Sequence, residues 1–124
     1  LPATWRSYEV DPAFARPAII TAMKSRHLPL FKDNPGETEI ETEWTYIPAG
    51  AIKARERFRV SWEYDFSDKL LFIYVRHERQ EEQYDGFKRD WSSSSHDAAQ
   101  ERSLLDEIER ALTTLHQAVQ GSSS

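Results

Sequence analysis

The spacing of apolar residues changes along the chain between a period of about 3.6 and a period of 2, and these changes predict the elements. Apolar residues at helical spacing predict a first helix over about residues 16–26, where Pro17 suits the first turn. Farther along, apolar and polar residues alternate, which predicts strands over about 39–46, 55–66 and 69–79. A short polar turn separates the last two strands, so they are expected to form a hairpin.

The end of the chain predicts a long helix over about residues 97–120. Five apolar residues fall on one seam at helical spacing: Leu105, Ile108, Leu112, Leu115 and Val119. A serine of the run 92–95, or Asp97, is expected to cap the start of this helix, and Gly121 is expected to end it. The preceding segment, residues 80–95, is polar and is expected to be irregular.

These elements predict an α+β fold. The alternating strands leave one apolar face that needs a cover, and the long helix is the expected cover. We therefore predict a two-layer arrangement in which an antiparallel three- to four-stranded meander packs against a long C-terminal helix and a short N-terminal helix. Residues 4–10 have a strand-like composition, and they are expected to form the fourth strand. Residues 1–120 are expected to form a single domain, and residues 121–124 a flexible tail.

Composition narrows the classes of partner. The 124 residues carry a net charge of −5, from 21 acidic and 16 basic residues, which argues against a nucleic-acid partner. No apolar run approaches the roughly 20 residues that a membrane-spanning helix needs. The chain begins at Leu1 rather than at a methionine, which favours removal of a signal or of a lipidated leader. We therefore expect a lipid anchor on a removed N-terminus, and a periplasmic or outer-membrane-anchored protein over a cytoplasmic one.

No catalytic or metal-binding pattern is present. The four histidines, His27, His77, His96 and His116, lack the close spacing of a zinc pair, so each is expected to be a surface or helix-end residue. The serine run 92–95 lacks the glycines of a nucleophile elbow, and the absence of cysteine excludes thiolate chemistry. We predict a protein that is not an enzyme and that needs no cofactor.

Charged residues of two predicted strands suggest a contact surface. Glu41 and Glu43 share a strand face, and Arg57 and Arg59 share the exposed face of the neighbouring strand. Cross-strand ion pairing is the simpler interpretation of this pattern. The alternative is an electrostatic docking face for a partner.

An aromatic segment precedes the last helix. Tyr84, Phe87 and Trp91 interrupt a polar stretch, where they either fold back onto the core or recognise a partner. The predicted partner-binding residues are therefore Glu41, Glu43, Arg57, Arg59, Tyr84, Phe87 and Trp91.

The order of helix, three-strand meander, polar aromatic loop and long C-terminal helix resembles the BamC-like helix-grip domains of bacterial envelope lipoproteins. The resemblance covers roughly residues 16–119 and includes the segments 41–44 and 55–60. It implies an envelope accessory protein that binds other proteins and has no catalytic residues.

We thus predict a non-enzymatic protein-binding or assembly module, the soluble domain of a bacterial envelope lipoprotein. One alternative is a domain that binds a small apolar ligand in a cavity between helix and sheet, lined by Trp44, Trp62 and Tyr64. Another is an enzyme whose site is assembled from scattered residues. The identity of the partner and the oligomeric state stay open.

Overall fold

A computed structural model of the chain describes residues 3–34, 36–49, 52–84 and 86–122. The predicted α+β fold is confirmed: an antiparallel sheet packs with a long C-terminal helix and a short N-terminal helix. The elements in chain order are β1 (Thr4–Tyr8), the 3-10 helix η1 (Pro12–Phe14), α1 (Ala15–Ser25), β2 (Leu30–Asp33), β3 (Glu39–Thr42), β4 (Thr45–Ala49), β5 (Ile52–Asp65), β6 (Leu70–Tyr84), β7 (Arg89–Trp91) and α2 (Ala98–Ser122).

The long hairpin of β5 and β6 is the centre of the sheet. Its strands pair from Ala54 opposite Glu81 to Asp65 opposite Leu70, farther than the predicted hairpin extended. The strand order is β1-β6-β5-β3-β2, and β4 also pairs with β5 while β7 pairs with β6. The sheet is therefore larger than the predicted meander, because β2 and β7 form in segments for which no strand was expected.

The segment predicted as one strand over residues 39–46 is divided into β3 and β4. Ile40 lies opposite Val60, whereas Tyr46 lies opposite Arg55, so the pairing with β5 shifts by one residue between them. At the end of β3, Thr42 Oγ1 accepts a hydrogen bond from the Phe58 N–H of β5 at 2.9 Å. Because side chains alternate between faces, a shift of one residue turns every later side chain of this segment to the other face.

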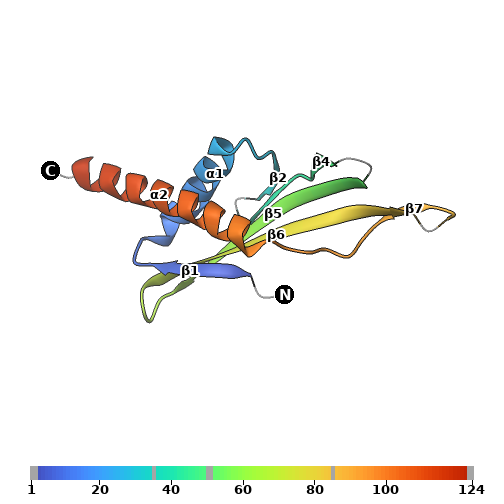
Figure 1. Ribbon diagram of the computed structural model, residues 1–124. Coiled ribbons are helices and arrows are strands. Elements are labelled where there is room, and N and C mark those ends of the chain that lie inside the picture. The colour runs from blue at the N-terminus through green and yellow to red at the C-terminus, as the bar shows by residue number, and fades with distance from the viewer. Residues whose placement is uncertain (1–2, 35, 50–51, 85, 123–124) are drawn as a thin grey trace.

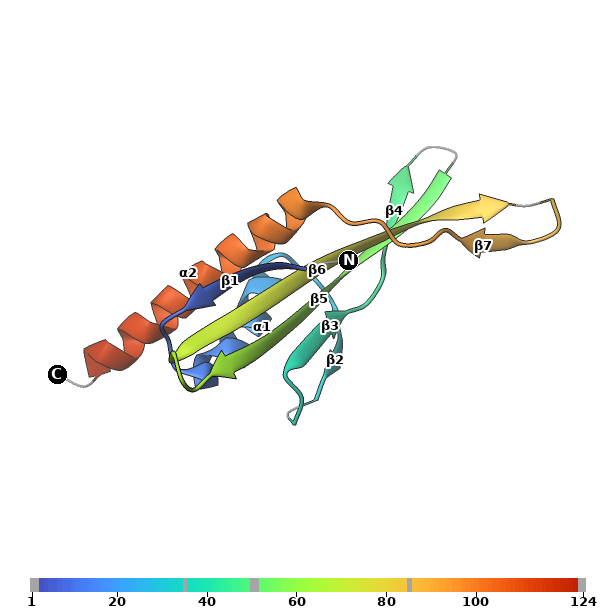
Figure 2. The ribbon, with the colours of Figure 1, turned by 90° about the horizontal axis from the view of Figure 1, so that it is seen from below.

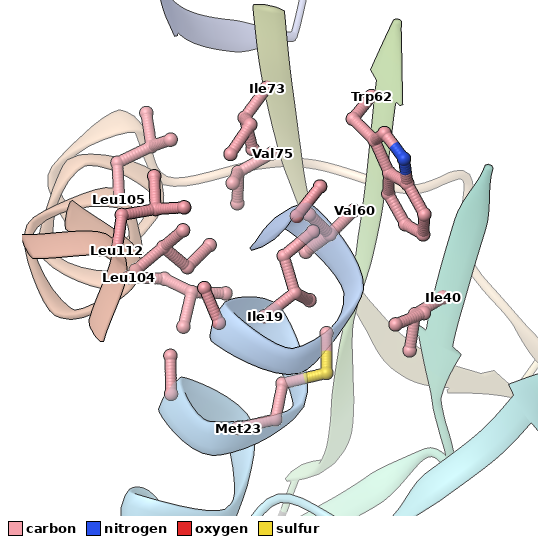
Figure 3. Packing of buried hydrophobic residues seen from close by; sticks show 14 of the residues in the cluster. Ile19, Met23, Ile40, Val60, Trp62, Ile73, Val75, Leu104, Leu105 and Leu112 are labelled. Carbon is pink, nitrogen blue, oxygen red and sulfur yellow. The ribbon is translucent and has the colours of Figure 1, made fainter. Parts of the chain in front are cut away.

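Both helices cover the same face of the sheet (Figure 1). Phe58, Val60 and Trp62 of β5 are buried there, as predicted. Figure 3 shows Val60 close to Ile19 of α1. The fully buried helix residues include Ile19, Met23, Leu104, Leu105 and Ile108. The apolar seam of α2 is shorter than predicted, since Val119 is 52% exposed.

The ends of α2 differ in how well the sequence predicted them. Asp97 caps the helix, because its Oδ1 accepts a hydrogen bond from the Ala99 N–H at 2.9 Å. At the other end the helix continues through Gly121 to Ser122, so Gly121 does not end it. Residues 123 and 124 of the predicted tail lie outside the described residues.

The sheet extends well beyond the helices. Figure 2 shows β4, β7 and the adjoining parts of β5 and β6 projecting past α1 and past the start of α2. We call the described residues 45–49, 52–56, 79–84 and 86–95 the arm, and the helix-covered remainder the body. The prediction that the segment 80–95 is irregular was wrong for much of its length, because residues 80–84 continue β6 and residues 89–91 form β7, which pairs with β6. After β7 ends, Ser95 still exchanges backbone hydrogen bonds with Arg79, at 2.8 and 2.9 Å.

Candidate functional site: the outer face of the sheet

The face of the sheet opposite the helices, which we call the outer face, carries most of the predicted contact residues. Residues directly opposite each other in antiparallel strands share a face. The pairing therefore places Arg57 with Glu78, and Glu41 with Arg59, on the outer face. No helix among the described residues covers this face (Figures 1 and 2).

The centre of the outer face is a network of ion pairs. Arg57 contacts Glu41 Oε1 through Nη1 at 2.5 Å and Glu78 Oε2 through Nη2 at 2.9 Å. Arg59 contacts Glu78 at 3.4 Å and Glu39 at 3.3 Å. The side chains of Glu41 and Glu78 are only 11% and 9% exposed. Glu41, expected to face water, is thus largely buried beneath its partners.

The charges of this network reinforce one another. Burial opposes the charged form of Arg59, but the hydrogen bond with Glu78 and the charges of Glu41 and Glu39 outweigh it and raise the pKa of Arg59. Because each carboxylate at the centre is already paired, the network is better suited to holding the face rigid than to attracting a partner's charge. Of the two interpretations, cross-strand ion pairing therefore accounts better for Glu41, Arg57 and Arg59 than a docking face does.

Toward the arm, arginine and tryptophan side chains stack in a continuous row. Arg57 and Arg55 lie 4.3 and 4.2 Å from the ring centre of Trp44, and Arg55 also lies 4.2 Å from that of Trp91. The Arg55 guanidinium, held between two indole rings, donates through Nε and Nη2 to Gln80 Oε1 at 2.8 and 2.6 Å. Such cation–π contacts stabilise by about 0.5–2 kcal/mol each.

Exposed aromatic and basic side chains continue the row on the arm. Tyr46 contacts the Trp91 ring at a centroid distance of 6.1 Å, yet it is 64% exposed. Tyr84, which shares the outer face of β6 with Gln80, is 70% exposed, and Arg89 lies opposite it on β7. Basic groups outnumber acidic ones here, since Lys53, Arg55 and Arg89 share this part of the face with Glu82.

The predicted contact residues are not all together. Glu41, Arg57, Arg59, Tyr84 and Trp91 lie on the outer face. Glu43 is exposed in the link between β3 and β4, where its N–H donates to the Pro29 carbonyl at 2.8 Å. Phe87, which is 97% exposed, lies between β6 and β7 near the tip of the arm.

The three aromatic residues of the predicted ligand cavity lie on opposite faces of the sheet. Trp44 stacks with arginines on the outer face, whereas Trp62 is buried among the core residues. Tyr64 is half-buried at the end of the hairpin and packs edge-on against Phe66, with ring centres 5.0 Å apart. The structure therefore does not bring all three together in one cavity, because the shift between β3 and β4 turns Trp44 away from the helices.

Sequence reasoning did not identify Arg55, Gln80 and Glu78 as parts of this site. A signal was present, because Arg55, Arg57 and Arg59 alternate along one strand. Their partners could not be assigned without the register of β6, which places Gln80 and Glu78 opposite the first two arginines.

His77 was expected to lie at the surface or at a helix end, but it is buried within the sheet. Its Nε2 lies 2.8 Å from Glu56 Oε2, and its Nδ1 accepts the Asp97 N–H at 3.1 Å, so both ring nitrogens are occupied. The buried Glu101 accepts the His77 N–H at 2.8 Å and the Thr4 hydroxyl at 2.6 Å. This cluster joins α2 to β1 and β6. Among the described residues, no group of three or more histidine, cysteine, aspartate or glutamate side chains could hold a metal ion.

Comparison of the sequence with protein-family models finds no match, and comparison with curated proteins finds none either. Within the described part of the chain, neither helix is both long enough and apolar enough to cross a membrane.

Proposed function

We propose that this protein is a non-enzymatic protein-binding module that contacts its partner through the outer face of the arm. The observation that carries the proposal is the row of Trp44, Arg55, Trp91 and Tyr46, continued by Tyr84, on a face that no described helix covers. Tryptophan, tyrosine and arginine are the residues most often found at the energetic centres of protein interfaces. Their stacking keeps the surface ordered before the partner arrives, which lowers the entropic cost of binding.

The contact is expected to use side chains rather than an added strand. β4 contains Pro48, which lacks a backbone N–H, and β7 has only three residues. Such edges are poor templates for pairing with another strand. The partner is therefore expected to lie across the face of the arm.

The charges of the arm indicate what kind of surface fits it. The net basic face formed by Lys53, Arg55, Arg89 and Glu82 contrasts with the overall charge of −5. A partner surface that combines acidic and apolar side chains complements both the basic groups and the exposed tyrosines. An envelope lipoprotein that recruits such a partner is the setting implied by the resemblance to the helix-grip domains, and it stays part of the proposal.

The test is an affinity capture from the source organism that compares variants of one surface. Wild-type protein is expected to retain one stoichiometric partner, and Arg89→Glu and Tyr84→Ser are each expected to weaken its binding by about tenfold. Arg102→Glu makes the same charge change on an exposed position of α2 and is expected to bind as the wild type does.

Three results would contradict the proposal. The first is the absence of any stoichiometric partner, and the second is a partner retained equally by Arg89→Glu and wild type. The third is tight, salt-sensitive binding of single-stranded oligothymidylate by the arm, which would assign its basic and aromatic residues to nucleic acid.

A further inference from the structure

An open groove lies at the end of the body farthest from the arm. Figure 2 shows the last turns of α2, the start of α1 and the turn between β5 and β6 at this end of the molecule. Together with the link after β1, these segments line a groove of about 590 Å³ that is open to solvent. Sites for small organic ligands commonly have volumes of about 300–1,000 Å³.

The floor of the groove is apolar and partly aromatic. It includes the half-buried side chains of Val10, Phe14 and Tyr64, and the exposed Val119 lines the groove beside them. The ring of His116, which also lines the groove, lies edge-on to Phe14 at a centroid distance of 6.5 Å. The negative face of an aromatic ring attracts organic cations, and the hydrocarbon surface of the ring packs against apolar groups.

The rim of the groove is acidic. Glu9, Asp11 and Asp68 contribute three carboxylates, and Lys69 contributes one ammonium group. One oxygen of Asp11 accepts the Ala13 N–H at 2.8 Å and so fixes this carboxylate at the start of η1. The surplus of negative charge repels anions and favours a positively charged ligand.

We propose that this groove binds a small amphipathic organic cation, with its hydrocarbon part on the aromatic floor and its ammonium group at the acidic rim. A neutral apolar molecule would gain nothing from the carboxylates, and an organic anion would be repelled by them. The site is separate from the outer face of the arm, so it does not depend on the function proposed there.

Three probes of the same shape test the charge requirement. Phenethylammonium, phenethyl alcohol and 3-phenylpropanoate differ mainly in carrying a positive, a neutral or a negative group. Titrated into the ¹⁵N-labelled full chain, phenethylammonium is expected to shift the amide signals of Val10, Phe14, Lys69 and Val119. The alcohol is expected to bind about threefold to tenfold more weakly, and the carboxylate more weakly still.

Paired variants test the residues. Glu9→Gln combined with Asp68→Asn preserves the shapes of both side chains and is expected to weaken phenethylammonium binding by about threefold to tenfold. Glu43→Gln neutralises an exposed carboxylate outside the groove and is expected to leave the affinity unchanged. Equal affinity for all three probes, shifts confined to other surfaces, or binding of a lysine-rich peptide but not of phenethylammonium would each overturn the proposal.

Discussion

The body and the arm share one β-hairpin but stabilise it by different means. In the body, α1 and α2 cover one face of β5 and β6, and aliphatic residues such as Ile73, Val75 and Leu105 are completely buried between the layers. In the arm the same two strands continue without a helix. There the side chains cover one another: Trp44 and Trp91 lie against Arg55, and Gln80 Oε1 accepts hydrogen bonds from its guanidinium group.

This difference shows how a sheet can extend beyond its hydrophobic core. Arginine has a long apolar stem and a planar head that stacks on indole rings, so it shields backbone and aromatic surface without a second layer. Many core side chains of the body are fully buried, whereas the stacked side chains of the arm are only half-buried and each contact between them is weak. The arm is therefore expected to open locally while the body stays folded.

The largest expected effect comes from the core of the body. Leu105→Ala removes a fully buried side chain between α2 and the sheet, and it should lower the free energy of unfolding by about 3–5 kcal/mol. Urea denaturation followed by far-ultraviolet circular dichroism measures this loss. Val119→Ala, on an exposed turn of the same helix, is the matched control and should cost less than about 1 kcal/mol. Similar losses for both variants would show that the helix does not bury its seam as described.

A change in the arm should act locally. Trp44→Ala removes the ring that both Arg55 and Arg57 contact, and it should speed amide hydrogen exchange in β4 and in the arm part of β5 by about tenfold. Amides of the body should keep their wild-type rates. Trp5→Ala, at an exposed tryptophan of the body, should leave exchange in the arm unchanged. Equal acceleration in both regions would contradict the separation between them.

The smallest expected effect is a loss of stability at alkaline pH, caused by the burial of Tyr8 in the body. Burial in the body is the main cause that raises the pKa of Tyr8 to about 12, above its ordinary value of 10.0. The folded state therefore favours the neutral phenol, so this stabilisation is complete below pH 10 and is lost as the pH rises toward 12. Between pH 8 and pH 11 the wild type should lose about 1 kcal/mol more than Tyr8→Phe, after allowance for partial exposure. Urea denaturation at both pH values makes the comparison, and equal losses would show that Tyr8 titrates as a solvent-exposed phenol.

The sequence was informative wherever one local rule decided the outcome. Strict alternation over residues 58–62 predicted which side chains of β5 face the helices, because side-chain direction has a period of 2 in any strand. The seam through Leu105, Ile108 and Leu112 predicted the covering helix, and Asp97 predicted its start. These features depend on residues close together in the chain.

The candidate site was only partly predictable, because its contacts depend on register. Glu41, Arg57 and Arg59 were identified from their alternation, but the stack of Trp44, Arg55 and Trp91 was not. Those three residues come from the link before β4, from β5 and from β7. No spacing rule connects them, since each pair meets only after the strands have aligned.

The sequence by itself determined the α+β class, the buried face of the hairpin and the helix that covers it, because each follows from periodicity in a short segment. Only the tertiary structure decided that Trp44 faces outward, that His77 is enclosed, and that the sheet continues past the helices as an arm. The physical reason is that a shift of one residue between two strands costs little locally, yet it reverses which side chains meet water. That choice is made by hydrogen bonds such as the one from the Phe58 N–H to Thr42, which join residues far apart in the chain.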